Sequence, residues 1–385
     1  MSVFKTRNST KAANHERAAA AAPVPLEETG PSAMRAFIEG DELYAAMLAD
    51  IRSATRWVRL ETYIYSGDEV GRMFAQALVE RARAGCRVRL RLDAIGSFDT
   101  VANAFIHELE EQGVEVEWCR RWQWRKPFDL HRRNHRKLLI VDRRCFYLGG
   151  FNLHRESSRA HFGESRWRDT HLRVEGVLVA AAIAAFDEYE RPRRKRQHWR
   201  DLRTGDGYLI PNLGFTRRFL LHRLYRFAFN RAQKRLWITT PYFVPPASLQ
   251  RAMIAAAKRG VDVRVLVPRR IDIFLVQWAS RAVYARLLKG GVRIFEYLPR
   301  MLHAKVAVID DGWATVGTAN LDYRSLFIND ELVLVITQKN LSAQIAAQFE
   351  HDLESSEEIT GVRWSQRHGA AWIAELLGWL TRRWL

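Results

Sequence analysis

The residues best suited to chemistry occur in two copies of one short pattern. The pattern reads H-x-K-x-x-x-x-D, and it fixes His135, Lys137 and Asp142 in the first copy and His303, Lys305 and Asp310 in the second. Six residues separate each Asp from a glycine-led turn that ends in asparagine, which is Asn152 in the first copy and Asn320 in the second. One such match carries little information, but two with the same downstream spacing are difficult to assign to chance.

The apolar residues between each Lys and Asp predict a buried β-strand, because they are rich in β-branched side chains. Side chains alternate between the two faces of a strand, so the His and Lys of each copy project from the same face. Two such pairs would suit phosphoryl transfer. One imidazole attacks phosphorus, the other protonates the leaving group, and Lys137 and Lys305 neutralise the phosphate oxygens in place of a metal ion. Asn152 and Asn320 can donate hydrogen bonds to the same oxygens.

Asp142 and Asp310 stand at the far ends of the two predicted strands. Their position along the strand has the wrong parity for direct contact with the His of the same copy. We therefore expect them to fix the turn that follows each strand. A catalytic role comes second, and we retain both residues among the catalytic candidates on that basis.

Both halves of the chain show the same order of predicted elements, and this alternation of strands and helices is typical of an α/β fold. In the first half we expect strands over 59–65, 87–94, 114–118 and 145–149 and helices over 41–55, 69–84 and 102–112. In the second half we expect strands over 236–242, 261–267 and 292–296 and helices over 219–231, 248–258 and 276–289. The duplication predicts two α/β sandwich halves related by a pseudo-two-fold axis, with the active site between them.

Composition suggests how the remaining residues are divided. An alanine tract and scattered charges predict that residues 1–33 are disordered. The two halves are expected at 34–190 and 213–362, joined by a basic linker at 191–212. Residues 363–385 have the pattern of an amphipathic helix. This helix could equally pack onto the core or lie in the plane of a membrane surface.

The charge of the chain predicts a polyanionic partner. Lys and Arg number 61 against 43 acidic residues, which gives a net charge of +18 and favours either nucleic acid or an anionic membrane. Thirteen Trp residues favour the membrane interface.

The three Cys residues have no C-x-x-C spacing and indicate neither a zinc site nor a disulfide framework. The apolar runs fall short of the about 18 residues of a spanning helix, and the start lacks the order of a signal peptide. We therefore expect a cytosolic or peripheral membrane protein.

A basic and aromatic loop precedes the first His–Lys strand and has no counterpart in the second half. It contains Arg120, Arg121, Trp122, Trp124, Arg125 and Lys126. One interpretation is a solvated surface loop. The other is a rim of the active site, where the cations bind phosphate headgroups and the two indoles enter the membrane interface.

The doubled pattern resembles the phospholipase D superfamily. The flanking sequence is similar to that of bacterial cardiolipin synthases over about residues 35 to 365, and the segments that carry this similarity are 167–171 (WRDTH), 239–246 (TTPYFVPP) and 317–326 (GTANLDYRSL). Gly149-Gly150 departs from the Gly-Ser that many members of the superfamily carry. The chain also lacks the amino-terminal membrane helices of some synthases, and so looks like the shorter, peripheral type.

This resemblance implies a set of roles. His135 would be the nucleophile and His303 the acid and then the base, although the near-equivalence of the halves makes these roles interchangeable. Each His needs a partner that fixes its tautomer, and the candidates are Asp169 and Glu331. No metal or other cofactor is implied. One phosphatidylglycerol would donate its phosphatidyl group and a second phospholipid hydroxyl would accept it, at the cytoplasmic face of the bacterial inner membrane.

Two other activities on the same fold are compatible with the motifs. Transfer to water would make the protein a phospholipase D, and a nucleic-acid substrate would make it a phosphodiesterase or nuclease. The net charge does not distinguish these alternatives from lipid transfer. The aromatic loop and the Trp-rich carboxyl-terminal segment favour lipid, so we expect anionic phospholipid and a membrane surface as partners. Nucleic acid and an obligatory protein partner are not expected.

Overall fold

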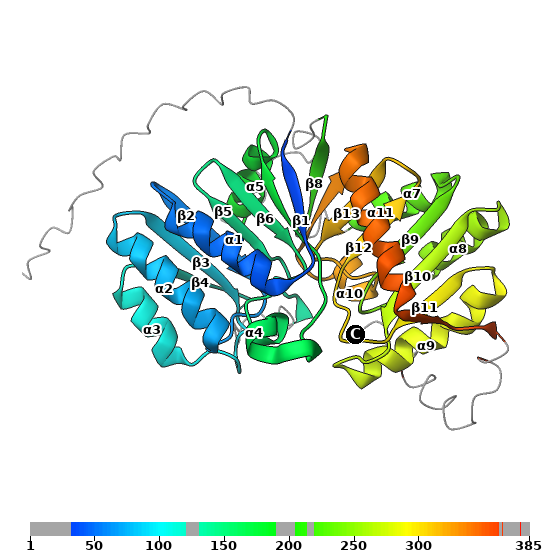
Figure 1. The fold of residues 1–385 in the computed structure, drawn as a ribbon, viewed down its shortest axis with the longest axis horizontal. Helices are drawn as coiled ribbons and strands as arrows, with labels where there is room; N and C mark the ends of the chain where they lie inside the picture. The colour runs from blue at the N-terminus through cyan, green and yellow to red at the C-terminus, as the bar shows by residue number, and fades with distance from the viewer. Residues whose placement is uncertain are drawn as a thin grey trace, which may run out of the picture.

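The computed structural model describes residues 32–120, 131–189, 205–213 and 219–361, together with 364 and 378. Within these residues the chain forms two mixed β-sheets covered by helices, and the two sheets lie side by side in Figure 1. The predicted α/β fold with two similar halves is therefore confirmed. In the same part of the chain, no helix combines the length and hydrophobicity needed to cross a bilayer.

The first sheet has the strand order β1-β7-β6-β5-β2-β3-β4. Its strands are β1 (Met34–Phe37), β2 (Trp57–Thr62), β3 (Arg87–Asp93), β4 (Glu115–Cys119), β5 (Leu138–Val141), β6 (Cys145–Gly149) and β7 (His171–Glu175). The helices of this half are α1 (Gly40–Arg52), α2 (Glu69–Arg83), α3 (Asn103–Glu111), α4 (Arg159–Phe162) and α5 (Leu178–Asp187).

The second sheet has the strand order β15-β11-β10-β9-β12-β13-β14-β8. Its strands are β8 (Gly207–Asn212), β9 (Arg235–Thr239), β10 (Asp262–Pro268), β11 (Arg293–Tyr297), β12 (Val306–Ile309), β13 (Trp313–Gly317), β14 (Glu331–Ile336) and β15 (Ser356–Glu358). The helices are α7 (Leu220–Arg231), α8 (Ala247–Lys258), α9 (Phe274–Lys289), α10 (Tyr323–Phe327) and α11 (Lys339–Glu354).

The two sheets correspond strand by strand. Read from β1 and from β8, they have the same order, and β15 is the one addition to the second. Local contacts repeat as well: the hydroxyl of Thr62 donates to the carbonyl of Ile64, and the hydroxyl of Thr240 donates to that of Tyr242. The halves are thus related by an approximate two-fold axis, as the repeated sequence pattern predicts.

Strand direction determines where the two motifs lie. β2 and β3 run parallel, and β5 is antiparallel to β2, so the start of β5 lies at the edge where β2 and β3 end. In the second half β9 and β10 run parallel, and β12 is antiparallel to β9. Both apolar runs, 138–141 and 306–309, are buried in the sheets. The residues just before these strands therefore stand at an edge formed by strand ends, where loops can build a site.

One apolar core joins the halves. Ile140 of β5 and Phe186 of α5 belong to the same buried cluster as Val308 of β12 and Phe349 of α11. Such shared burial is the main favourable term in association of the two halves, because apolar surface leaves water on both sides. The space between the sheets is thus fixed by packing as well as by the chain connection.

Some elements differ from the sequence prediction. The predicted linker at 191–212 includes β8, which pairs with β14 and so belongs to the second sheet. β1, β7 and β14 and helix α11 were not predicted, and β2 ends at Thr62 rather than at residue 65. Residues 1–31 of the predicted disordered segment, and most of the predicted helix at 363–385, lie outside the described residues.

Candidate active site

Each His of the repeated pattern is bound by a carboxylate from the opposite half. Nδ1 of His135 lies 3.1 Å from both carboxylate oxygens of Glu331. Nδ1 of His303 lies 2.6 Å from Oδ2 of Asp169. All four side chains are buried. Each carboxylate can accept the Nδ1–H proton and thereby leave Nε2 as the free base, so the two pairs fix the tautomer that nucleophilic chemistry needs.

Backbone hydrogen bonds hold these pairs in register. The amide of His135 donates to the carbonyl of Asp330 (3.0 Å), and the amide of His303 donates to the carbonyl of Arg168 (2.7 Å). Asp330 directly precedes Glu331 and Arg168 directly precedes Asp169. In both pairs, the chain segment that carries the carboxylate is thus bonded to the segment that carries the His.

The two lysines lie beside the imidazoles. Nζ of Lys137 donates to the carbonyl of His135 at 2.9 Å. Nζ of Lys305 lies 2.9 Å from Nε2 of His303 and 3.8 Å from the carboxylate of Asp169. Among the described residues, no group of three His, Cys, Asp or Glu side chains is arranged to hold a metal ion. These two ammonium groups place positive charge directly beside the imidazoles.

Burial changes the protonation of the site. Burial and the charge of Lys305 lower the pKa of Lys137 to about 7, and burial lowers the pKa of Lys305 to about 8. Burial and the charge of Lys305 lower the pKa of His303 to about 3. Burial also lowers the pKa of His135, which Glu331 partly offsets. Both imidazoles are therefore neutral near pH 7 in the unliganded site, while the lysines are poised to respond to a bound anion.

A cavity of about 700 Å³ opens onto both imidazoles. It is lined by Tyr63, Ile64, Ile95, His131, Arg133, His135, Asn152, Trp167, Tyr242, Asp272, Ile273, Val276, His303, Asn320, Asp322, Arg324 and Asn329. The ring of Tyr63 lies 4.9 Å from that of His135, and the indole of Trp167 lies 5.1 Å from the ring of His303. Both predicted asparagines line this cavity, where their amides can reach a bound phosphate.

The turns behind the two carboxylates are not equivalent. The hydroxyl of Thr318 donates to Glu331 at 2.5 Å. The corresponding residue of the first half is Gly150, where an added Cβ would lie 2.1 Å from the Asp169 carboxylate. Glycine at this position therefore lets Asp169 occupy the space that a Ser or Thr side chain would fill. This is the physical reason for the Gly-Gly departure found in the sequence.

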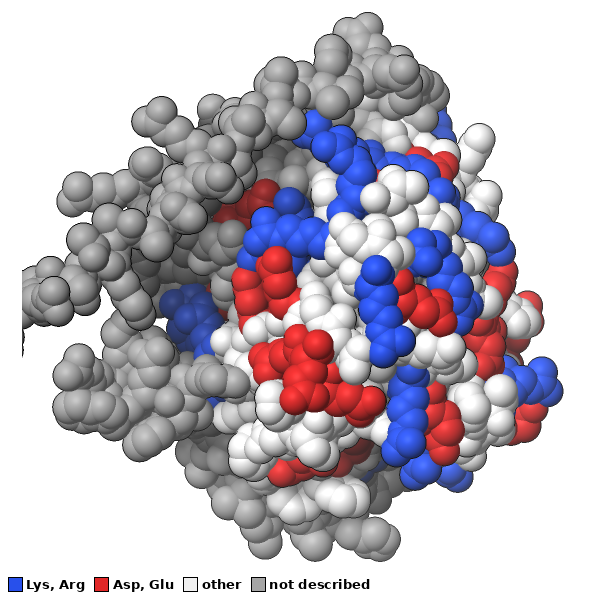
Figure 2. Space-filling view, turned by 90° about the vertical axis from the view of Figure 1, so that its left-hand side faces the viewer, with Lys and Arg blue, Asp and Glu red and all other residues white. Residues whose placement is uncertain are grey.

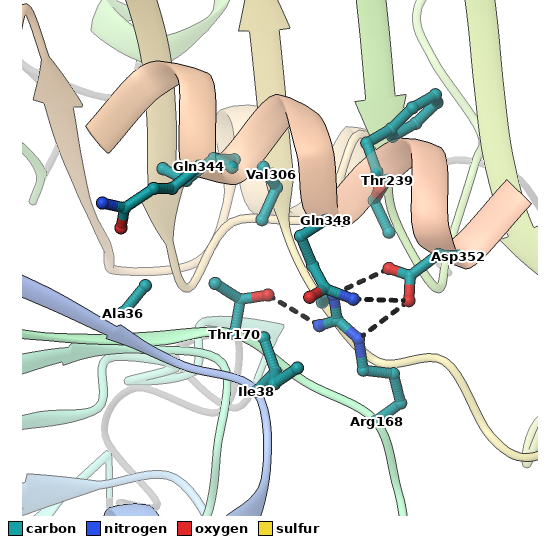
Figure 3. Close-up of a pocket in the computed structure, with 12 residues that line it drawn as sticks. Ala36, Ile38, Arg168, Thr170, Thr239, Val306, Gln344, Gln348 and Asp352 are labelled. Atoms are coloured by element: carbon teal, nitrogen blue, oxygen red, sulfur yellow. Dashed lines mark hydrogen bonds and ion pairs between the residues drawn. The ribbon is translucent and has the colours of Figure 1, made fainter. Parts of the chain in front are cut away.

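Ion pairs between the halves lie directly behind both His–carboxylate pairs. Arg168 forms an ion pair with Asp352 of α11 at 2.7 Å, and both side chains are at most 5% exposed. Figure 3 shows this pair in a second cavity of about 200 Å³, lined by β1 residues and by α11. In the other half, Asp330 takes the equivalent place and binds Arg120, Arg132 and the hydroxyl of Tyr189. We call these two contacts the interdomain clamps.

Asp142 and Asp310 lie in the turns that the sequence predicts them to fix. Asp142 accepts hydrogen bonds from the amides of Thr55, Arg56 and Trp57 at the opposite end of β5 from His135. Asp310 accepts the amides of residues 233–235 in the same way. Both have positive φ, 51° and 53°, in the tight turn after each strand. Their carboxylates fix these turns and do not reach the imidazoles.

The basic and aromatic loop is largely outside the described residues. Arg121, Trp122, Trp124, Arg125 and Lys126 belong to that undescribed part. Arg120 is described, and its guanidinium binds Asp330 in one of the interdomain clamps. That Arg120 binds phosphate headgroups therefore stays a prediction, and in this structure its charge is paired between the halves.

Several residues of the site escaped the sequence prediction. Tyr63, Arg133 and Arg324 line the cavity, and Thr318 binds Glu331, but none belongs to the H-x-K pattern. Trp167, Thr318, Asp322 and Arg324 lay inside segments noted only for their resemblance to a family. The repeat itself offered a signal for Tyr63, because it follows Thr62, the counterpart of Thr240.

Two His–Lys–carboxylate sets, whose imidazoles line one cavity between duplicated α/β halves, have the arrangement of a phosphodiester-transfer site of the phospholipase D type. A family model described as "Cardiolipin synthase, PLD-like domain" matches residues 47–169 and 225–353. The chain is 34% identical over 361 residues to a cardiolipin synthase of Geobacillus kaustophilus, with 87% of this chain and 69% of that protein covered. It is 32% identical over 334 residues to cardiolipin synthase A of Pseudomonas syringae, with 85% and 70% covered.

Solved structures share the fold at low sequence identity. Phosphatidylserine synthase of Haemophilus influenzae superposes with a TM-score of 0.70 at 15% identity, with 91% of this chain and 95% of that chain covered. Polyphosphate kinase of Porphyromonas gingivalis superposes with a TM-score of 0.58 at 13% identity, with 86% and 49% covered. The family model and the two relatives show that the chain belongs to the cardiolipin synthase family of phospholipase D-like proteins. The solved structures show that the fold is shared.

Proposed function

We propose that this protein is a cardiolipin synthase that transfers a phosphatidyl group from phosphatidylglycerol to the hydroxyl of a second phospholipid. The observation that carries the proposal is the pair of imidazoles at one cavity, each bound at Nδ1 by a carboxylate of the opposite half. Transfer through a covalent enzyme intermediate requires one group that attacks phosphorus and another that handles the proton. Family membership supports phospholipid as the substrate class.

In the first step, Nε2 of His135 attacks phosphorus and the bond to the glycerol oxygen breaks. His303 gives its proton to this oxygen, and glycerol leaves while the phosphatidyl group stays on His135 as a phosphohistidine. His303 must gain a proton for this role. A bound phosphodiester carries one negative charge, which offsets the charge of Lys305 that lowers the pKa of His303.

In the second step, the direction of proton transfer reverses. His303, now neutral, removes the proton from a phospholipid hydroxyl, and the hydroxyl oxygen attacks phosphorus. The phosphorus–nitrogen bond breaks and His135 is restored. Atoms and charge balance over the two steps, and the sole difference between synthesis and hydrolysis is whether a lipid hydroxyl or water enters.

The cations and amides of the cavity stabilise the charge on phosphorus. Lys137 and Lys305 are buried beside the imidazoles, and Asn152 and Asn320 line the same cavity. Charged donors are most effective where water is excluded and their positions are fixed before the reaction. We propose that these four side chains bind the non-bridging oxygens in both steps.

The carboxylates contribute to catalysis by stabilising and orienting the two histidines. Imidazolium forms in each step, and a buried carboxylate at Nδ1 stabilises it and holds the ring in place. We propose this role for Glu331 toward His135 and for Asp169 toward His303. The enzyme would meet its lipids at an anionic membrane surface, as a peripheral protein at the cytoplasmic face of the inner membrane.

The test follows the products. Purified protein is incubated with vesicles that contain labelled phosphatidylglycerol and, in parallel, with a labelled oligonucleotide. Cardiolipin with equimolar glycerol is the expected product. Phosphatidic acid alone would make the protein a phospholipase D, and cleavage of the oligonucleotide without lipid turnover would make it a nuclease. The variant with both His135→Ala and His303→Ala controls for contaminating activity.

A further inference from the structure

The most exposed large hydrophobic side chains of the described residues occur in two equivalent loops. Phe98, in the loop between β3 and α3, is 74% exposed, and Phe274, at the start of α9 after β10, is 70% exposed. β3 and β10 occupy corresponding places in the two sheets. The helices that follow the loops, α3 and α9, both lie toward the lower edge of Figure 1. We call residues 94–99 and 270–275 the rim loops.

The rim loops flank the opening of the active-site cavity. Ile95 from the first loop and Ile273 from the second line this cavity, and both are also nearly half exposed, at 47% and 44%. Leu275, at 42%, adds to the apolar surface of the second loop. Each half therefore contributes one exposed apolar loop to the cavity that contains His135 and His303.

Hydrogen bonds fix the shape of both loops. In the first, Asp93 accepts the amides of Ile95 and Gly96 at 3.0 Å, and the hydroxyl of Ser97 donates to the carbonyl of Tyr63. In the second, the hydroxyl of Tyr242 donates to Asp272 at 2.8 Å. Tyr63 and Tyr242 both line the cavity. Each loop is thus held by a hydrogen bond to a tyrosine that lines the cavity. The apolar side chains are therefore exposed on loops of fixed shape.

We propose that the rim loops form a two-part docking surface that inserts its apolar side chains into a phospholipid bilayer. This inference rests on the proposed function, since it names the surface through which that site meets its lipids. Exposed apolar patches next to a site mark interaction surfaces, and apolar side chains beside cations are the composition of an interfacial anchor. Arg133 and Arg324 line the cavity between the loops, and Arg270 is exposed on the second loop. These charges complement anionic headgroups.

The position of the loops explains why a bilayer fits better than other occupants. Because one loop comes from each half, insertion of both would turn the cavity opening toward the headgroups and place phosphodiesters directly at its entrance. A second copy of the chain on the same surface would cover that entrance. A polyanion such as nucleic acid would gain nothing from the aliphatic side chains of Ile95, Ile273 and Leu275.

The test compares binding with chemistry. The variant with Phe98→Ala and Phe274→Ala is measured by flotation with vesicles of phosphatidylglycerol and phosphatidylcholine. We expect its affinity for vesicles to fall by roughly tenfold or more for each Phe, the cost of withdrawing an aromatic side chain from an apolar phase. Turnover of short-chain phosphatidylglycerol below its micelle concentration should be retained, because neither Phe lines the cavity. Phe227→Ala, at a site 58% exposed on α7, is the matched control and should bind vesicles like the original protein.

A second measurement does not depend on the stability of the alanine variant. The cysteines at 86, 119 and 145 are buried, so Phe98→Cys can be labelled selectively with a polarity-sensitive fluorophore. A blue shift on addition of vesicles supports insertion. An unshifted probe together with unchanged vesicle binding of the alanine variant would overturn the proposal, as would a loss of self-association in that variant with vesicle binding intact. If vesicles bind through the loops but no cardiolipin forms, the proposed function fails and the docking surface stands.

Discussion

At the scale of single residues, the active site is more asymmetric than its motifs. Glu331 receives the hydroxyl of Thr318 in addition to Nδ1 of His135. Asp169 has no such hydroxyl, because Gly150 stands in place of Thr318, and it lies near Lys305 instead. The two imidazoles therefore experience different surroundings, which permits one to act as nucleophile and the other as acid and base.

The roles of the two histidines can be separated by trapping. With His303→Ala, attack by His135 is still possible while release of the intermediate is impaired, so a labelled phosphatidyl-enzyme should accumulate. With His135→Ala, no covalent label should form. Both variants should lose several orders of magnitude in turnover. Acid-quenched protein labelled from phosphatidylglycerol gives the readout, and label on the His135→Ala variant alone would exchange the two roles.

The lysines predict how anion binding depends on pH. Their charged form is the protonated one, and their pKa values of about 7 and about 8 lie below the ordinary value of 10.5. Positive charge is therefore present below pH 7 and is lost as pH rises through about 8. Sulfate keeps its charge over this range, so its inhibition constant should be flat at low pH and rise steeply above about pH 8.

A competition series from pH 5.5 to 10, on the order of ten points, would resolve this transition from that of an ordinary lysine. Lys305→Met should remove the upper part of the transition and weaken sulfate binding at every pH below it. Sulfate inhibition that stays constant up to pH 9.5 would mean that both lysines keep ordinary pKa values.

The sequence predicts the reacting groups but not how they are paired. The H-x-K-x-x-x-x-D pattern pointed to both imidazoles and both lysines, and resemblance pointed to Asp169 and Glu331. Sequence spacing alone does not show that each carboxylate binds the His of the opposite half, because this pairing depends on how the halves pack. For Asp142, strand parity indicated a turn-fixing residue that does not contact His135, but it did not show which three amides the carboxylate binds.

At the scale of elements, helix α11 is tied to the active site through one ion pair. Asp352, near the end of α11, holds Arg168, whose backbone bonds the segment of His303. Arg168 also donates to the carbonyl of Asp169 and to the hydroxyl of Thr170. A displacement of α11 would thus be transmitted to the His303–Asp169 pair. The helix makes no contact with substrate in this scheme and acts through position alone.

Asp352→Asn tests this clamp. Removal of one partner leaves the Arg168 charge buried and uncompensated, so the free energy of unfolding should fall by about 3 kcal/mol or more. We also expect a lower kcat with little change in KM, because His303 loses its alignment. Denaturant unfolding and steady-state kinetics measure the two effects.

A compensated variant separates position from stability. Changing Arg168→Met and Asp352→Leu together replaces the ion pair by apolar contacts and should recover stability without recovering kcat. Glu42→Gln in the exposed pair with Arg35 is the control, and should change stability by less than about 1 kcal/mol. Full recovery of kcat in the apolar variant would limit the clamp to a structural role.

The helices with regular apolar spacing were the easiest elements to predict. Helices α2, α3 and α8 lie within a residue or two of their predicted bounds, because their apolar spacing is regular. β8 was hidden in the predicted linker, because it follows a basic run and contains Pro211, which sits poorly in a strand. Its pairing with β14 is a long-range contact that local pattern does not encode.

At the scale of the molecule, the described surface of the face in Figure 2 carries no single continuous patch of positive charge. Figure 2 looks onto the end of the first half and shows basic and acidic side chains interspersed on its described surface. Ion pairs such as Arg52 with Glu80 and Arg87 with Glu115 belong to elements of this half. The described surface at this end of the molecule therefore shows no single basic track of the kind that would favour nucleic acid.

Each His is paired with a carboxylate of the opposite half, and this crossed pairing predicts how the halves depend on each other. A protease site introduced between residues 190 and 204 would allow the purified protein to be cut between its sheets. The shared core and the interdomain clamps should keep the fragments together and active. Fragments separated in denaturant should each be inactive, because each lacks the carboxylate for its own His, and activity should return when they are refolded together. Activity in one fragment alone would contradict the crossed pairing.

The charge reversal between the two clamps bears on the history of the chain. Arg168 and Asp330 hold equivalent places, yet one is a cation and the other an anion. A symmetric dimer of identical subunits would carry the same residue at both places, and any substitution there would appear twice. Opposite charges are possible only once the two copies are encoded separately. The clamps therefore reflect divergence after duplication, and they make the present halves unable to substitute for each other.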